Sequence, residues 1–143
     1  DALRIIELSA RNQGLRWTAR INLMELAART HHEVEFEQYR RALADEPLVA
    51  VQRAGYLRDV GTGCTAFGRY REARSALNEG LAVATAHGLH QLGFEIETAT
   101  RALEIAEREE RIGQDSQPTL SDAPEDIRSA LRELLRETSG ATA

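Results

Sequence analysis

The sequence has no lysine, one cysteine, three prolines and few aromatic residues, and several of these shortages exclude a structural class. A lone cysteine, Cys64, excludes an internal disulfide and is typical of a reducing compartment. Only one proline, Pro47, lies between Asp1 and Gly113, so long helices are not interrupted there. No apolar run approaches the roughly 20 residues that span a bilayer. We therefore expect a cytoplasmic protein that makes no contact with a membrane.

All 18 of the lysine and arginine positions are arginine, and they are outnumbered by 23 acidic residues. The resulting formal net charge of −5 argues against direct nucleic-acid binding, which needs a basic excess. Arginine suits the recognition of carboxylates and phosphates. The arginines are spread along the whole chain, however, which favours codon bias in a high-GC genome over a selected binding surface.

The abundant residues are alanine, leucine, glutamate and arginine, which are strong helix formers. Apolar residues recur every three or four positions, and no stretch alternates strictly enough to predict a strand. The pattern predicts an all-α fold of about seven helices in antiparallel hairpins. The expected ranges are 3–10 with an end at Gly14, 15–29, 33–44, 47–67 with Pro47 in the first turn, 70–86, 89–113 and 124–137.

Three regions follow from these ranges. Residues 1–113 form a helical domain, and residues 114–122, which include Pro118, form an exposed linker. Residues 123–143 form a C-terminal helix with a frayed end. Asp122 and Glu125 have the spacing of a capping box at the start of this helix.

An internal repeat links the two central hairpins. A shift of 38 residues aligns Thr30 with Gly68 at the turn and Leu43 with Leu81. Within the second copy, small residues alternate with large ones on facing helices. These residues are Gly61, Ala73, Leu77 and Gly80.

In this pattern the segment 54–87 resembles a tetratricopeptide repeat, although a period of 38 is longer than the usual figure of about 34. The resemblance implies a short α-solenoid that binds ligands on a concave surface lined by the first helix of each hairpin. The residues implied on this partner-binding face are Trp17, Arg20, Met24, Arg58, Thr62, Thr65, His90, Phe94 and Glu97.

Several of these residues have a second interpretation. Arg20 and Arg58, one repeat apart, would together hold a peptide carboxylate, or they are two solvated surface arginines. Trp17 is either a partner anchor or a core residue, because it shares a helical face with Ile21 and Met24. The histidine clusters at 31–32 and 87–90 have no evident third ligand, so no metal is expected.

The C-terminal helix carries an apolar stripe that docks against the preceding helix or pairs with a second copy to make a homodimer. The residues of this stripe are Ile127, Leu131, Leu134 and Leu135.

The sequence has no Gly-rich phosphate loop, nucleophile elbow or H-E-x-x-H motif. We therefore expect a non-catalytic module that binds a protein or peptide and needs no cofactor. The alternative is a sensor or oligomerisation domain of a larger bacterial transcription regulator or signalling ATPase. That alternative is motivated by the stretched repeat and by a chain that begins at Asp1 rather than at methionine.

Overall fold

The computed structural model describes residues 2–116 and 124–140. The described residues form six helices and no strand. Their bounds are α1 Ala2–Arg29, α2 Glu33–Ala44, α3 Ala50–Ala66, α4 Tyr70–Ala86, α5 His90–Ser116 and α6 Glu125–Gly140. The chain divides into two compact units, Asp1–Glu107 and Arg108–Ala143, and the boundary lies within α5.

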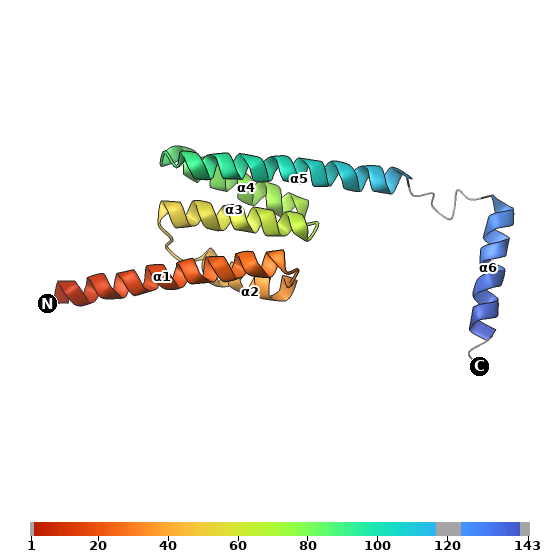
Figure 1. Ribbon diagram of the computed structural model, residues 1–143, viewed down its shortest axis with the longest axis horizontal. Helices are drawn as coiled ribbons and strands as arrows, with labels where there is room; N and C mark the ends of the chain where they lie inside the picture. The colour runs from red at the N-terminus through yellow and green to blue at the C-terminus, as the bar shows by residue number, and fades with distance from the viewer. Residues whose placement is uncertain (1, 117–123, 141–143) are drawn as a thin grey trace. The chain divides into compact units, whose positions relative to one another are not determined.

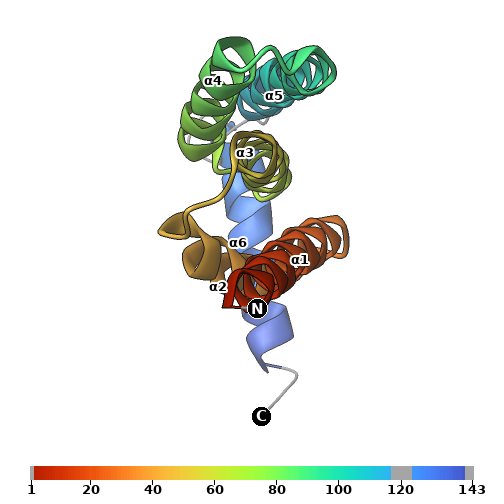
Figure 2. The ribbon, with the colours of Figure 1, turned by 90° about the vertical axis from the view of Figure 1, so that its left-hand side faces the viewer.

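The first unit is built from hairpins of successive helices. In both views α1, α3 and the part of α5 in this unit lie along one side, and α2 and α4 lie along the other (Figures 1 and 2). The expected all-α fold is confirmed. Two of the expected ranges, 33–44 and 70–86, coincide with α2 and α4.

The expected count of about seven helices is wrong for the described residues, because the first two expected helices are one. Helix α1 continues through Gly14, whose φ is not positive. A glycine inside a helix costs only about 1 kcal/mol relative to alanine. The Gly14 carbonyl also accepts a hydrogen bond from Gln52 Nε2 at 3.2 Å. The helix therefore has no reason to end there.

Two other helix boundaries in the structure differ from the expected ones, the start of α3 and the end of α5. Pro47 precedes α3 instead of lying in its first turn, and the Val49 N–H donates to Gln52 Oε1 at 3.4 Å. Helix α5 extends to Ser116, since no strong helix breaker comes before Pro118. The expected linker is thus helical at 114–116. Its remainder and Asp122 of the expected capping box lie outside the described residues.

The turns that close the α1–α2 and α3–α4 hairpins have the same geometry as each other, and the turn at Gly88 between α4 and α5 shares it. His31, with φ 58°, and Gly68, with φ 73°, adopt the left-handed conformation just after α1 and α3. The N–H of the next residue, His32 or Arg69, donates to a carbonyl five residues back at 2.8 Å. This is the Schellman termination. His31 thus occupies the position that glycine occupies in the second hairpin.

These turns correct the register of the repeat. Arg29 and Ala66 end their helices, and Glu33 and Tyr70 begin the next ones. Both pairs are 37 residues apart, so the expected shift of 38 is wrong by one residue. A slip of one residue rotates every α-helical position by about 100°.

Glycines of α3 let the neighbouring helices approach closely. A Cβ atom on Gly61 would collide with the Leu77 side chain of α4, and one on Gly63 would collide with the Phe36 ring of α2. Leu77 and Phe36 are among the most buried side chains of the core. Gly61 thus allows α3 and α4 to pack closely, and Gly63 leaves room for the Phe36 ring of α2 against α3.

We expect Gly61→Ala to lower the free energy of unfolding by about 1–3 kcal/mol, because the new methyl group overpacks the core. Gly55→Ala is the matched control, since a Cβ atom there meets nothing within 4 Å. It should raise the free energy of unfolding by about 0.5–1 kcal/mol through helix propensity. Denaturant unfolding followed by circular dichroism measures both. Equal effects of the two substitutions would contradict the close contact.

Candidate functional site

One side of α3, here named the outward face, contains the residues that the resemblance implied on this helix. It consists of Gly55, Arg58, Thr62 and Thr65. Thr62 is exposed, and Arg58 and Thr65 are half-buried. Each threonine hydroxyl donates to a backbone carbonyl one turn back, Thr62 to Arg58 at 3.0 Å and Thr65 to Gly61 at 2.8 Å. Gly55 lies on the same stretch of helix with open space beside it. The face is therefore polar and low in relief.

Arg58 is not free to bind a partner's carboxylate, because it already has two carboxylate partners. Its Nε donates to Asp59 Oδ1 at 3.0 Å, and its Nη1 donates to Glu95 on α5. Burial opposes the charge of Arg58, but the bonds to Asp59 and Glu95 outweigh it and raise the pKa. Hydrogen bonds from Gln91 and from Arg58 lower the pKa of Glu95. The cluster joins α3 to α5.

Asp59 is the one buried charged side chain among the described residues, with 6% of its surface exposed. Burial raises its pKa from 3.8 to about 6, although Arg58 acts in the opposite direction. Glu25 on α1 and Glu95 on α5 repel the ionised form and raise the pKa further. This carboxyl group is costly to ionise where it lies.

The implied residues of α1 do not share a face with those of α3. Trp17 and Met24 are core side chains, and Met24 has no exposed surface. Arg20 is exposed but lies on a different side of the helix. The cause is the register error, because the shift of 38 paired α1 and α3 positions that differ by about 100°.

The observed shift of 37 places other α1 residues in equivalent positions on the outward face. They are Thr18, Glu25 and Arg29, which correspond to Gly55, Thr62 and Ala66. Gln52 Nε2 on α3 donates to Thr18 Oγ1 at 3.3 Å. Glu25 and Arg29 form an exposed ion pair at 3.8 Å. Sequence reasoning missed these three residues because it aligned Thr30 with Gly68, whereas His31 has the left-handed conformation equivalent to that of Gly68.

The remaining implied residues gather in two clefts. His90, Phe94 and Glu97 line a cleft of about 250 Å³ with the C-terminal end of α4. On α5 these three lie on a different side from Glu95. Trp17 and Arg20 line a second cleft of about 470 Å³. The structure therefore brings eight of the implied residues together in three groups rather than in one groove, and Met24 lies apart from them in the core.

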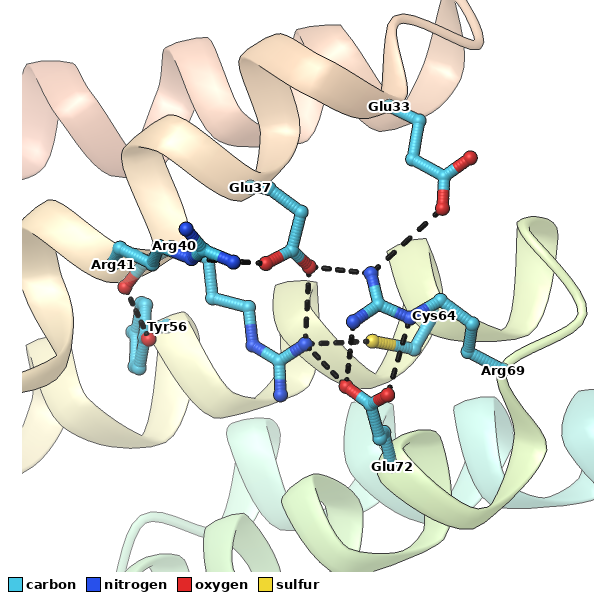
Figure 3. A network of polar contacts seen from close by, with 8 residues as sticks. All are labelled: Glu33, Glu37, Arg40, Arg41, Tyr56, Cys64, Arg69 and Glu72. Carbon is cyan, nitrogen blue, oxygen red and sulfur yellow. Dashed lines mark hydrogen bonds and ion pairs between the residues drawn. The ribbon is translucent and has the colours of Figure 1, made fainter.

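A charged network ties α2 to α4 and uses two more arginines (Figure 3). Arg40 Nη1 lies 2.6 Å from Glu72 Oε2 and 3.2 Å from Glu37 Oε1. Arg69 Nη2 lies 2.8 Å from Glu72 Oε2, and Arg69 also donates to Glu37. Burial acts to raise the pKa of Glu37, but the bonds from Arg69 and Arg40 outweigh it and lower the pKa. The four side chains are mutually neutralised and serve packing.

Cys64 lies beside this network and is fully buried. Arg40 Nη1 is 3.6 Å from its Sγ. Burial raises the pKa of the thiol, although Arg40 and Arg69 act to lower it. A buried thiol with a raised pKa is a poor nucleophile.

In the C-terminal unit, α6 exposes the four residues of its apolar stripe. The exposed fractions are 51% for Ile127, 38% for Leu131, 59% for Leu134 and 68% for Leu135.

The described part of the chain contains no group of three His, Cys, Asp or Glu residues that could hold a metal ion. None of its helices is both long and apolar enough to cross a membrane. No protein-family model matches the chain, and neither does any curated protein or solved structure.

We expect Asp59→Asn to stabilise the protein at neutral pH by about 2–3 kcal/mol relative to the wild type. The native carboxyl group binds its proton more tightly than the unfolded one, because its pKa is raised from 3.8 to about 6. The wild type therefore loses stability relative to the variant as the pH rises through this window, and the difference is constant above it. Denaturant unfolding at a series of pH values measures the gap.

The matched control is Asp45→Asn, which removes an exposed carboxylate at the end of α2. As a substitution at an exposed position, it should change the free energy of unfolding by no more than about 0.5 kcal/mol. A gap for Asp59→Asn that stayed flat or narrowed with rising pH would disprove the cost of ionisation.

Proposed function

We propose that the chain is a non-catalytic, tetratricopeptide-like module that binds a protein or peptide on the outward face shared by α1, α3 and α5. The proposal treats the hairpins of the first unit as a short α-solenoid. The alternation of helices between two sides supports this arrangement, with α1, α3 and α5 on one side (Figure 2). The 37-residue repeat of helix ends supports it as well.

The observation that carries the proposal is the way this face is held together. Side chains bridge its helices, from Gln52 to Thr18 between α3 and α1, and from Arg58 to Glu95 between α3 and α5. These bridges fix the face before any partner arrives, which reduces the entropy lost on binding. The small residues Gly55 and Thr62 leave room for a partner backbone to approach α3.

The ion-paired groups of the first unit support binding rather than chemistry. The pKa values of Arg58, Glu95, Glu37 and Glu72 are shifted in the directions that ion pairing produces. Each of these shifts favours a permanently charged group. A general acid or base instead needs a pKa near the working pH and a place beside the substrate.

We expect Gly55→Arg to abolish binding of peptides selected on the wild-type protein. The change puts a long side chain on the outward face without touching the core, because nothing lies within 4 Å of a Cβ atom at this position. Peptides would be selected from a phage-displayed random library, and their affinity for wild type and variant measured by calorimetry. Circular dichroism would check that the variant is folded.

The matched control is Asn78→Arg, which adds the same side chain at an exposed position of α4. It should leave the affinity unchanged. If both variants bind the selected peptides like the wild type, the peptides use another surface and the assignment of the outward face is wrong.

A second candidate function is self-association, which is favoured by the exposed apolar stripe of α6. Its sequence is strongly amphipathic, with Ile127, Leu131 and Leu134 separated by charged residues. Such a helix buries its apolar side when it pairs with a second copy.

Under this candidate, light scattering after size exclusion should give a dimer for the wild type and a monomer for the double variant Leu131→Glu and Leu134→Glu. Arg132→Glu changes the net charge by the same amount on the same helix and should remain a dimer. A monomeric wild type at high concentration would exclude self-association.

A further inference from the structure

The second cleft, between α1 and the loop that joins α2 to α3, has a chemistry of its own. It is lined by polar and charged residues, and its volume is about 470 Å³. The lining residues are Ser9, Asn12, Gln13, Arg16, Trp17, Arg20 and Glu46. Arg16 and Arg20 lie one turn apart on α1, on a side of the helix away from Thr18 and Glu25. The cleft is therefore a separate surface from the outward face.

The two arginines of this cleft differ from the five arginines whose side chains bond to a carboxylate of another helix. Arg40, Arg53, Arg58, Arg69 and Arg74 are each bonded to a carboxylate. Within the described residues, Arg16 and Arg20 make no hydrogen bond or ion pair, not even with Glu46 across the cleft. Two like charges four residues apart on a helix repel each other by a few tenths of a kcal/mol. A bound anion would relieve that repulsion.

Trp17 supplies a second, independent observation. Its side chain is 9% exposed and lines the cleft, yet its indole N–H donates to no acceptor in the described residues. No fully buried side-chain nitrogen there lacks a partner. The indole nitrogen therefore reaches solvent. Since so little of the ring is exposed, the N–H is held in place by packing and has no acceptor among the described protein atoms, so a ligand in the cleft can take the place of water there.

We propose that this cleft binds the carboxylates of an acidic peptide segment. Arg16 and Arg20 supply the guanidinium groups, which match a carboxylate in shape and charge. The Trp17 indole and the amides of Asn12 and Gln13 supply neutral donors. Glu46 contributes one negative charge against two positive ones, so the cleft remains cationic in a chain of net charge −5. The volume holds several side-chain groups, which favours a segment over a single small anion.

The test uses the full chain and the fluorescence of Trp17, which is its only tryptophan. An acetylated tetraglutamate peptide should change the emission in a saturable way. The tetraglutamine peptide of the same shape should not. Inorganic phosphate should bind about tenfold more weakly, because it engages the arginines without filling the cleft. Calorimetry checks each affinity independently of the fluorophore.

The double variant Arg16→Gln and Arg20→Gln should weaken tetraglutamate binding by about tenfold or more, since it removes two charge-assisted contacts. Arg4→Gln with Arg11→Gln removes the same charge from exposed positions of the same helix and should leave the affinity unchanged. All four positions are exposed, so both variants should unfold like the wild type.

Three results would overturn the proposal. The first is no saturable response of the wild type to tetraglutamate. The second is equal affinity in the Arg16 and Arg20 double variant. The third is phosphate that binds as tightly as the peptide, which would make the cleft a site for free anions. The Gly55→Arg variant separates this proposal from the outward-face proposal, because it leaves the cleft intact.

Discussion

The close approach of α3 to its neighbours is the constraint on which the first unit depends. Gly63 admits the Phe36 ring from α2, and Gly61 admits the Leu77 side chain from α4. Gly61 thereby brings α3 close to α4 within one hairpin, and Gly63 receives a side chain from the other hairpin. Because interiors are packed nearly as densely as crystals, the Gly63–Phe36 contact restricts how the two hairpins pack against each other. The contacts of both glycines also fix which side of α3 is left to face solvent.

The placement of charge follows from that packing. Where helices meet, arginines are joined to carboxylates, as in the network of Arg40 and Arg69 with Glu37 and Glu72 (Figure 3). Among the described residues, Asp59 is the one charged side chain that is buried, and burial raises its pKa to about 6. Where helices do not meet, arginines such as Arg16 and Arg20 remain without partners among the described residues. The groups proposed to bind a partner in the cleft are thus arginines that form no ion pair between packed helices.

Much of the fold could be predicted from the sequence, because helix propensity, apolar spacing and the glycines at 68 and 88 act locally. These local signals were enough to predict the bounds of α2 and α4 correctly. The helix end predicted at Gly14 was wrong, because the presence of a glycine does not determine whether the chain adopts a positive φ there. His31 misled the prediction in the opposite direction, because it adopts a left-handed conformation that is usual for glycine. That one residue shifted the repeat by one position.

The candidate site was harder to predict, for a reason that follows from helical geometry. One position of error rotates a helix by about 100°, so Met24 was expected on the partner-binding face but lies in the core. Trp17, for which both a partner-binding and a core position were open, is 9% exposed. Gly68 marks the register of α3, on which Thr62 is exposed and Arg58 and Thr65 are half-buried. The engagement of Arg58 by Asp59 and Glu95 could not be read from the sequence, because Glu95 comes from another helix.

The binding face depends on which side of α1 faces solvent next to α3. Thiol labelling along α1 tests this register most directly. Single cysteines would replace Thr18, Ile21, Met24 and Glu25 in a Cys64→Ala background, and their reaction rates with a maleimide would be compared under native conditions. The account predicts fast labelling at 18 and 25 and slow labelling at 21 and 24, because the former face solvent and the latter are in the core. Fast labelling at 24 with slow labelling at 18 would show that the helix is rotated and that the outward face is wrongly assigned.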